Sequence, residues 1–175
     1  MQIKKCSKDT GMILLYSQED RPPRISPYEK CVFLAGPTPR SNDVASWRPE
    51  AIRLFEESDY DGYLCVPEFR NGKFNGDYMG QVEWEHRYLD QSNAILMWVP
   101  REMNDMPAFT TNIEFGLYVS PSDEESRLGV ASRLFYGRPD GAPKTTYMDY
   151  CYKKFTERKP QSSLKKLVDE VIKDI

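Results

Sequence analysis

The stretch Cys31-Val32-Phe33-Leu34-Ala35, followed at once by Gly36-Pro37, indicates the fold class of this chain. Five consecutive apolar residues without alternating polar ones are typical of a strand that is buried on both faces. Strands of that kind occur in parallel sheets that carry helices on either side. Two more short runs, 63–66 and 94–99, have the same character, and residues 12–16 and 133–136 read as further strands.

Helical patterns alternate with these runs. They predict helices near 47–57, at 78–91, from 112 to about 119 and at the C-terminus, where Ser162 or Ser163 can act as the cap. Residues 18–30 and 120–128 are polar and read as loops. Strands that alternate with helices over short connections predict a mostly parallel α/β sheet covered on both faces.

The length and net charge of the chain limit its number of domains and the kinds of partner that it binds. A chain of 175 residues suits one domain over 1–175, with a strand and loop in 1–30 and a helix in 161–175. The net charge of −3 argues against a nucleic-acid polymer or an anionic membrane as the main partner. No apolar run reaches membrane-spanning length, and 13–16 is too short for a signal peptide.

The metal-binding residue types are sparse. The four cysteines form no C-x-x-C pair, and the one histidine, His86, falls on the polar side of the 78–91 helix, where we expect no role for it. We therefore expect neither a metal nor a cofactor. Cys31 and Cys65 lie in apolar runs and are expected to be buried reduced thiols, which indicates a cytoplasmic protein.

Glu114 is the leading candidate for chemistry. The 94–99 strand runs into a proline-containing loop that ends in Thr110-Thr111-Asn112, and Glu114 follows just inside the helix start. Open α/β sheets bind ligands at the carboxyl ends of their strands, and a helix N-terminus favours an ionised carboxylate. Such a carboxylate suits a nucleophile in covalent glycosyl transfer. The same residues also read as a capping box with Thr111 as N-cap, so a structural role stays open.

Glu85 is the second carboxylate of interest. Val82, Glu85 and Leu89 are spaced i, i+3, i+7 on the 78–91 helix, and this side should face the sheet. A buried carboxylate without a partner is costly. Glu85 therefore either reaches a cation such as Arg101 or lines a cavity.

In their order along the chain, these motifs resemble the nucleoside 2-deoxyribosyltransferase superfamily, in its deoxyribosyltransferase-like branch of bacteria and phages. The resemblance covers roughly residues 31–147. The segments that carry it are V-F-L-A-G-P-T at 32–38, W-R-P at 47–49, V-P-E at 66–68, Q-V-E-W-E at 81–85, W-V-P-R at 98–101 and T-T-N-I-E-F-G at 110–116.

The resemblance implies a flavodoxin-like, doubly wound sheet and a homo-oligomer in which a neighbour helps to close the site. It places the nucleophile at Glu114 and an acidic partner, usually Asp in the better-known transferases, at Glu85. The loop Ala35-Gly36-Pro37-Thr38 would lie against the substrate. The chain departs from the better-known members where Thr110-Thr111-Asn112 and Ser92-Asn93 replace stretches that often contain Asp.

The function expected from this resemblance is N-glycosyl transfer at C1′ of a 2′-deoxynucleoside, by the logic of a retaining glycosidase. Asn112 would fix the nucleophile or a hydroxyl, and Trp47, Trp84 or Trp98 would stack on the base unless they belong to the core. Two alternatives stay open. One is a nucleotide or NAD glycohydrolase, with Arg40 and Arg101 on phosphate; the other is a nucleotide sensor without turnover.

Overall fold

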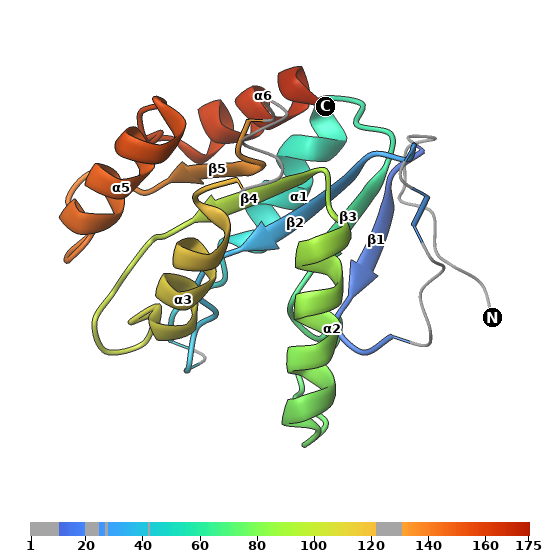
Figure 1. The fold of residues 1–175 in the computed structure, drawn as a ribbon. Coiled ribbons are helices and arrows are strands. Elements are labelled where there is room, and N and C mark those ends of the chain that lie inside the picture. Colours follow the sequence, from blue (N-terminus) through green and yellow to red (C-terminus); the bar gives the residue numbers. More distant parts are fainter. Residues whose placement is uncertain (1–10, 20–24, 27, 42, 122–130) are drawn as a thin grey trace.

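The computed structural model describes residues 11–19, 25–26, 28–41, 43–121 and 131–175. Within them, five strands form one parallel sheet in the order β1-β3-β2-β4-β5, as Figure 1 shows. The strands are β1 (Ile13–Tyr16), β2 (Cys31–Ala35), β3 (Tyr63–Val66), β4 (Ala94–Trp98) and β5 (Leu134–Gly137). The predicted parallel sheet is confirmed, with β1 at one edge and β5 at the other.

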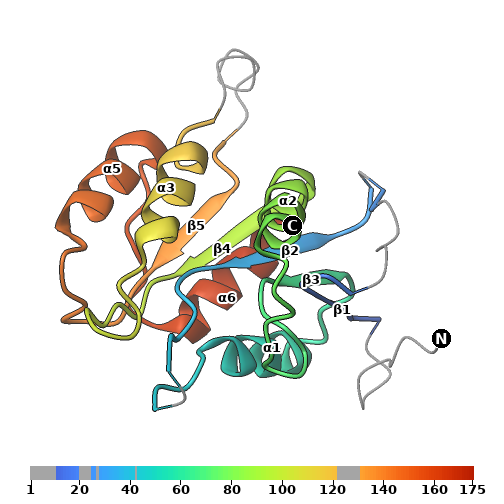
Figure 2. The ribbon, with the colours of Figure 1, turned by 90° about the horizontal axis from the view of Figure 1, so that it is seen from below.

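Helices cover both faces of this sheet. α1 (Arg48–Glu57) and α6 (Leu164–Asp174) lie on one face, and α2 (Tyr78–Gln91), α3 (Phe109–Tyr118) and α5 (Thr146–Thr156) lie on the other (Figure 2). The fold is therefore a doubly wound α/β fold of the flavodoxin-like type, as the sequence predicted.

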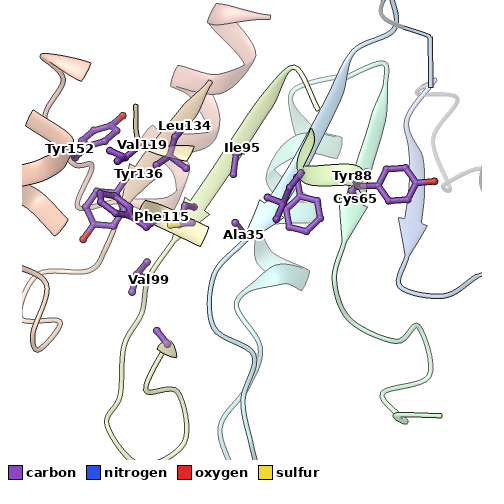
Figure 3. Close-up of a cluster of buried hydrophobic side chains, with 14 of the residues drawn as sticks. Ala35, Cys65, Tyr88, Ile95, Val99, Phe115, Val119, Leu134, Tyr136 and Tyr152 are labelled. Carbon is purple, nitrogen blue, oxygen red and sulfur yellow. The ribbon is translucent and has the colours of Figure 1, made fainter. Parts of the chain in front are cut away.

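The two faces of β2 explain its continuous apolar run. Phe33 and Ala35 belong to the core layer under α2, α3 and α5, where Figure 3 shows Ala35 with Phe115, Tyr136 and other buried side chains. Val32 and Leu34 belong to the layer under α1 and α6. Every residue of β2 is buried, so no position along it is free to be polar.

The strand order creates a topological switch point beside β2. The chain leaves β2 through α1 to reach β3 on one side, and then returns through α2 to β4 on the other side. Because α1 and α2 lie on opposite faces, a fold of this kind has a crevice where the carboxyl ends of β2 and β4 meet. This crevice is the place where such sheets bind ligands.

The start of α3 differs from the prediction. The helix begins at Phe109 instead of Asn112, and its N-cap is Ala108, with φ of 62° and no side-chain cap. Thr111 lies inside the helix and is buried, so the capping box of Thr111 and Glu114 is wrong. Glu114 lies beyond the first turn, where its carboxylate no longer meets the free N–H groups of the helix end.

Four further outcomes concern the rest of the chain. α5 was not predicted, because only Met148 and Tyr152 of its residues are buried and the apolar stripe is short. Cys31 and Cys65 are buried free thiols with their Sγ atoms 3.7 Å apart, as expected. Residues 122–128 of the expected surface loop lie outside the described residues. No helix in the described ranges is long and apolar enough to cross a membrane.

Candidate active site

A cavity of about 250 Å³ lies at the switch point, between α2 and α3. Its floor is formed by the end of β2 and the loop after it, and its two sides by the helices. The residues that line it are Phe33, Ala35, Gly36, Pro37, Thr38, Arg40, Arg48, Pro67, Tyr78, Gln81, Val82, Glu85, His86, Leu89, Pro107, Ala108, Phe109, Thr110, Thr111, Ile113, Glu114 and Leu117. Segments that are far apart in the sequence therefore meet at one hollow.

Gly36 allows the loop after β2 to lie flat against the core. Its φ is 140°, and a Cβ atom there would come within 2.2 Å of the Trp98 carbonyl oxygen and 2.9 Å of the Trp47 ring. Trp47 supports the loop from behind, with its Nε1 donating a hydrogen bond of 3.1 Å to the Pro37 carbonyl. The expected loop residues Gly36, Pro37 and Thr38 thus line the cavity, whereas Trp47 holds them in place from the core.

Glu114 projects from the second turn of α3 into the cavity. No hydrogen bond from the described part of the chain reaches its carboxylate. Burial, and after it the negative charge of Glu85, raises the pKa of Glu114 from 4.5 to about 7, against the opposing effect of Arg48. The carboxylate is thus poorly solvated when ionised, which raises its reactivity toward an electrophilic carbon.

Glu85 faces the same cavity from α2. Tyr78, Gln81, Val82 and Leu89 line the cavity with it, so the predicted grouping of these residues on one side is confirmed. The side of α2 that packs on the sheet is a neighbouring one, formed by Trp84, Tyr88 and Leu89. Gln81 donates a hydrogen bond of 2.9 Å to Oε1 of Glu85. Burial raises the pKa of Glu85, while the Gln81 hydrogen bond and the charges of Arg48 and His86 act in the opposite direction.

Two residues that line the cavity, His86 and Arg48, were not predicted from the sequence to belong to a site. His86 was expected on the opposite, polar side of α2, yet it lines the cavity near Glu85. The cavity extends far enough around α2 to include His86, the neighbour of Glu85 in the sequence. Arg48 lines the cavity as a fully buried cation, and the only sequence signal for it was its place in the Trp47-Arg48-Pro49 motif.

The aromatic rings at the cavity are not the expected tryptophans. Tyr78 and Phe109, the first residues of α2 and α3, line it from two sides and are 64% and 63% exposed. The guanidinium of Arg40 lies 5.5 Å from the centre of the Phe109 ring. Trp84 and Trp98 are buried in the two core layers and do not line the cavity.

Arg101 and Asn112 also lie outside the cavity walls. Arg101 donates to the Asn112 side chain and, at 2.6 Å, to the Lys144 carbonyl, so it ties α3 to the segment before α5. Its guanidinium does not reach Glu85, which pairs with Gln81 instead. Within the described ranges, no cluster of three or more His, Cys, Asp or Glu residues could hold a metal ion.

Residues 29–126 match the sequence profile of the family described as nucleoside 2-deoxyribosyltransferase like. The chain belongs to this family. The matched segment runs from just before β2 to just beyond α3 and so includes every residue that lines the cavity. It leaves out β1, β5, α5 and α6, which complete the sheet and its cover. A comparison with curated proteins gave no match.

Proposed function

We propose that the protein catalyses N-glycosyl transfer at C1′ of a 2′-deoxynucleoside, with exchange of the base. The observation that carries the proposal is the presence of two half-buried carboxyl groups, Glu114 and Glu85, in one cavity at the switch point of the family's fold. Retaining glycosyl transfer needs a pair of carboxyl groups of this kind, one as nucleophile and one to manage a proton.

In the proposed reaction, the ionised Glu114 attacks C1′ as the bond from C1′ to the base nitrogen breaks. The bonding electron pair leaves with the base. The two carboxyl groups raise each other's proton affinity and share one proton; in the reactive form this proton lies on Glu85, which donates it to the leaving base. The result is an ester between Glu114 and deoxyribose. A second base then attacks C1′, the ester bond breaks, and Glu85 takes up a proton from the incoming base. Water in place of the second base would give free deoxyribose.

The size and lining of the cavity support a ligand with one base and one sugar. A volume of about 250 Å³ is slightly below the usual range of small-ligand sites, about 300–1,000 Å³, and it favours a nucleoside over a dinucleotide such as NAD. The exposed rings of Tyr78 and Phe109 offer apolar faces for a planar base.

A 5′-monophosphate is the second candidate substrate. Arg40 lines the cavity, as does the hydroxyl-bearing Thr38. An arginine suits phosphate because its planar fork matches two phosphate oxygens. Arg101, the other arginine considered for this role, is turned toward Asn112 and Lys144.

The test of the proposal is base exchange by the purified protein. It is incubated with a deoxynucleoside and a different free base, and the products are separated by chromatography. A new deoxynucleoside indicates transfer, and free deoxyribose alone indicates hydrolysis. Intact-protein mass spectrometry should show an added deoxyribosyl group that Glu114→Gln lacks and that the exposed control Glu83→Gln retains. Full activity of Glu114→Gln would refute the mechanism.

We further propose that the protein is a cytoplasmic homo-oligomer. Phe109, Ile113 and Leu117 are spaced i, i+4, i+8 on α3, line the rim of the cavity and are exposed, which supports a neighbouring subunit over this face. Light scattering after gel filtration should give a mass above one chain for the natural protein and a lower one for Ile113→Glu. A single-chain mass for the natural protein would remove this proposal.

A further inference from the structure

Arg48 is the most constrained charged side chain of the site. Only 1% of its side chain is exposed, and its guanidinium bonds four acceptors. Nε donates to the Leu34 carbonyl at 3.1 Å and Nη2 to the Gly36 carbonyl at 2.6 Å. Nη1 donates to Thr38 Oγ1 at 2.9 Å and to Glu68 Oε1 at 2.7 Å. Three of these contacts fix the end of β2 and the loop that forms the cavity floor.

Glu68 supplies the counter-charge that a buried guanidinium requires. Its side chain is 19% exposed and is held by Ser46, whose Oγ donates to Glu68 Oε1 at 2.7 Å. Ser46 Oγ in turn accepts the Arg48 backbone N–H at 3.2 Å. These hydrogen bonds hold the ion pair in one geometry. Glu68 neutralises part of the Arg48 charge, so the strength of the pair determines how strongly Arg48 acts on other charged groups in the cavity.

We propose that Arg48 is a positioning residue for the glycosyl transfer proposed above. Its guanidinium holds the Gly36–Thr38 loop in place. Its positive charge, partly neutralised by Glu68, keeps Glu114 available as a carboxylate. The inference rests on the proposed function for its catalytic meaning. The structural part stands on the hydrogen bonds and the ion pair of Arg48, and the electrostatic part on the cavity that Arg48 and Glu114 both line.

The charges around Glu114 come from several elements. Glu85 and His86 project from α2, Arg40 from the loop after β2, and Arg48 from α1. Tyr118, on the same helix as Glu114, donates its hydroxyl to Asp90 at 2.7 Å. Among these groups Glu85 raises the pKa of Glu114 and Arg48 lowers it. Two substitutions in the ion pair should thus shift the pKa of Glu114 in opposite directions.

The signs follow from the charges. Glu68→Gln removes a negative charge that offsets Arg48, so the ionised form of Glu114 is favoured and its pKa falls. Arg48→Gln removes the favourable positive charge, so the pKa of Glu114 rises. Arg48→Lys keeps the charge but cannot span the Leu34 and Gly36 carbonyls and the Thr38 hydroxyl at once. It should leave the pKa of Glu114 close to its original value and disturb the cavity wall.

The primary experiment needs no substrate. Glutamate is labelled with ¹³C at its carboxyl carbon, and the Glu114 signal is identified by its loss in Glu114→Gln and followed by NMR as a function of pH. We expect Arg48→Gln to raise the midpoint and Glu68→Gln to lower it, each on the order of one pH unit. The exposed Glu83→Gln on α2 has the same charge change as Glu68→Gln and should leave the midpoint in place.

A kinetic experiment tests the positioning role. The acid limb of the pH profile of kcat/KM should move to lower pH in Glu68→Gln, and Arg48→Lys should lose at least about tenfold in kcat/KM with the limb unmoved. Equal midpoints in the natural protein and Glu68→Gln, or a higher one in Glu68→Gln, overturn the inference even if Arg48→Gln fails to fold. Lack of nucleoside turnover in the natural protein defeats the proposed function instead, and the NMR titration still decides the electrostatic part.

Discussion

Replacing Glu114 by Gln should stabilise the folded protein at neutral and alkaline pH while it abolishes turnover. The pKa of Glu114 is raised in the folded state, from 4.5 to about 7, chiefly by burial and by Glu85. The folded state therefore binds the proton more tightly than the unfolded chain does. The ionisation of Glu114 therefore leaves the free energy of unfolding unchanged below pH 4.5. It lowers this free energy as the pH rises from 4.5 to about 7 and keeps it lowered above that pH. A glutamine has nearly the same shape and no charge.

The magnitude follows from the size of the pKa change. The difference between 4.5 and about 7 is about 2.5 pKa units, which corresponds to at most about 3.5 kcal/mol at about 1.4 kcal/mol per unit. Glu114 keeps some contact with solvent, so we expect about 1–3 kcal/mol. For a domain of this length, about 2 kcal/mol corresponds to a rise in Tm of about 4–8 °C.

The assay is thermal unfolding of the natural protein, Glu114→Gln and the exposed control Glu83→Gln at several pH values from 4 to 9. The Tm difference between Glu114→Gln and the natural protein should be close to zero at pH 4 and should grow to its full value by pH 8. A capping role would give the opposite sign, a loss of about 0.5–2 kcal/mol. Equal stability of the two proteins at every pH, or a less stable Glu114→Gln at pH 8, would refute the argument.

Four further substitutions have defined outcomes. Glu85→Gln removes the negative charge that raises the pKa of Glu114, so the acid limb of kcat/KM should move to lower pH; a move to higher pH would contradict the pairing of the two carboxyl groups. Gly36→Ala should cost more than about 2 kcal/mol in chemical unfolding because of the positive φ and the clash with Trp98, whereas Gly116→Ala, in the open on α3, should gain up to about 1 kcal/mol. Arg40→Gln should reduce kcat/KM for a deoxynucleoside 5′-monophosphate by tenfold or more relative to the nucleoside, and an unchanged ratio would remove phosphate from the list of substrates.

Much of the fold could be predicted from local patterns. The unbroken apolar run of β2 required burial on both faces, and burial on both faces requires helices on both sides of a parallel sheet. The spacing along α2 also grouped Glu85 with Val82 and Leu89, which line the cavity with it, because a helix of fourteen residues has a stripe long enough to recognise. α5 escaped prediction because its buried stripe consists of Met148 and Tyr152 only, amid exposed aromatic and charged residues.

The sequence by itself determined the layered sheet, the side of α2 that carries Glu85 and the two carboxylates to test, because these depend on unbroken apolar runs and on helical spacing within one segment. Tertiary structure decided which other side chains share the cavity. The tryptophan side chains lie in the core, since the largest apolar surfaces gain most from burial. Arg48 became part of the site because the carbonyls at the end of β2 and the carboxylate of Glu68, which follows β3, converge on one point of α1. No local pattern records a convergence of three segments, since it exists only once the strands have paired.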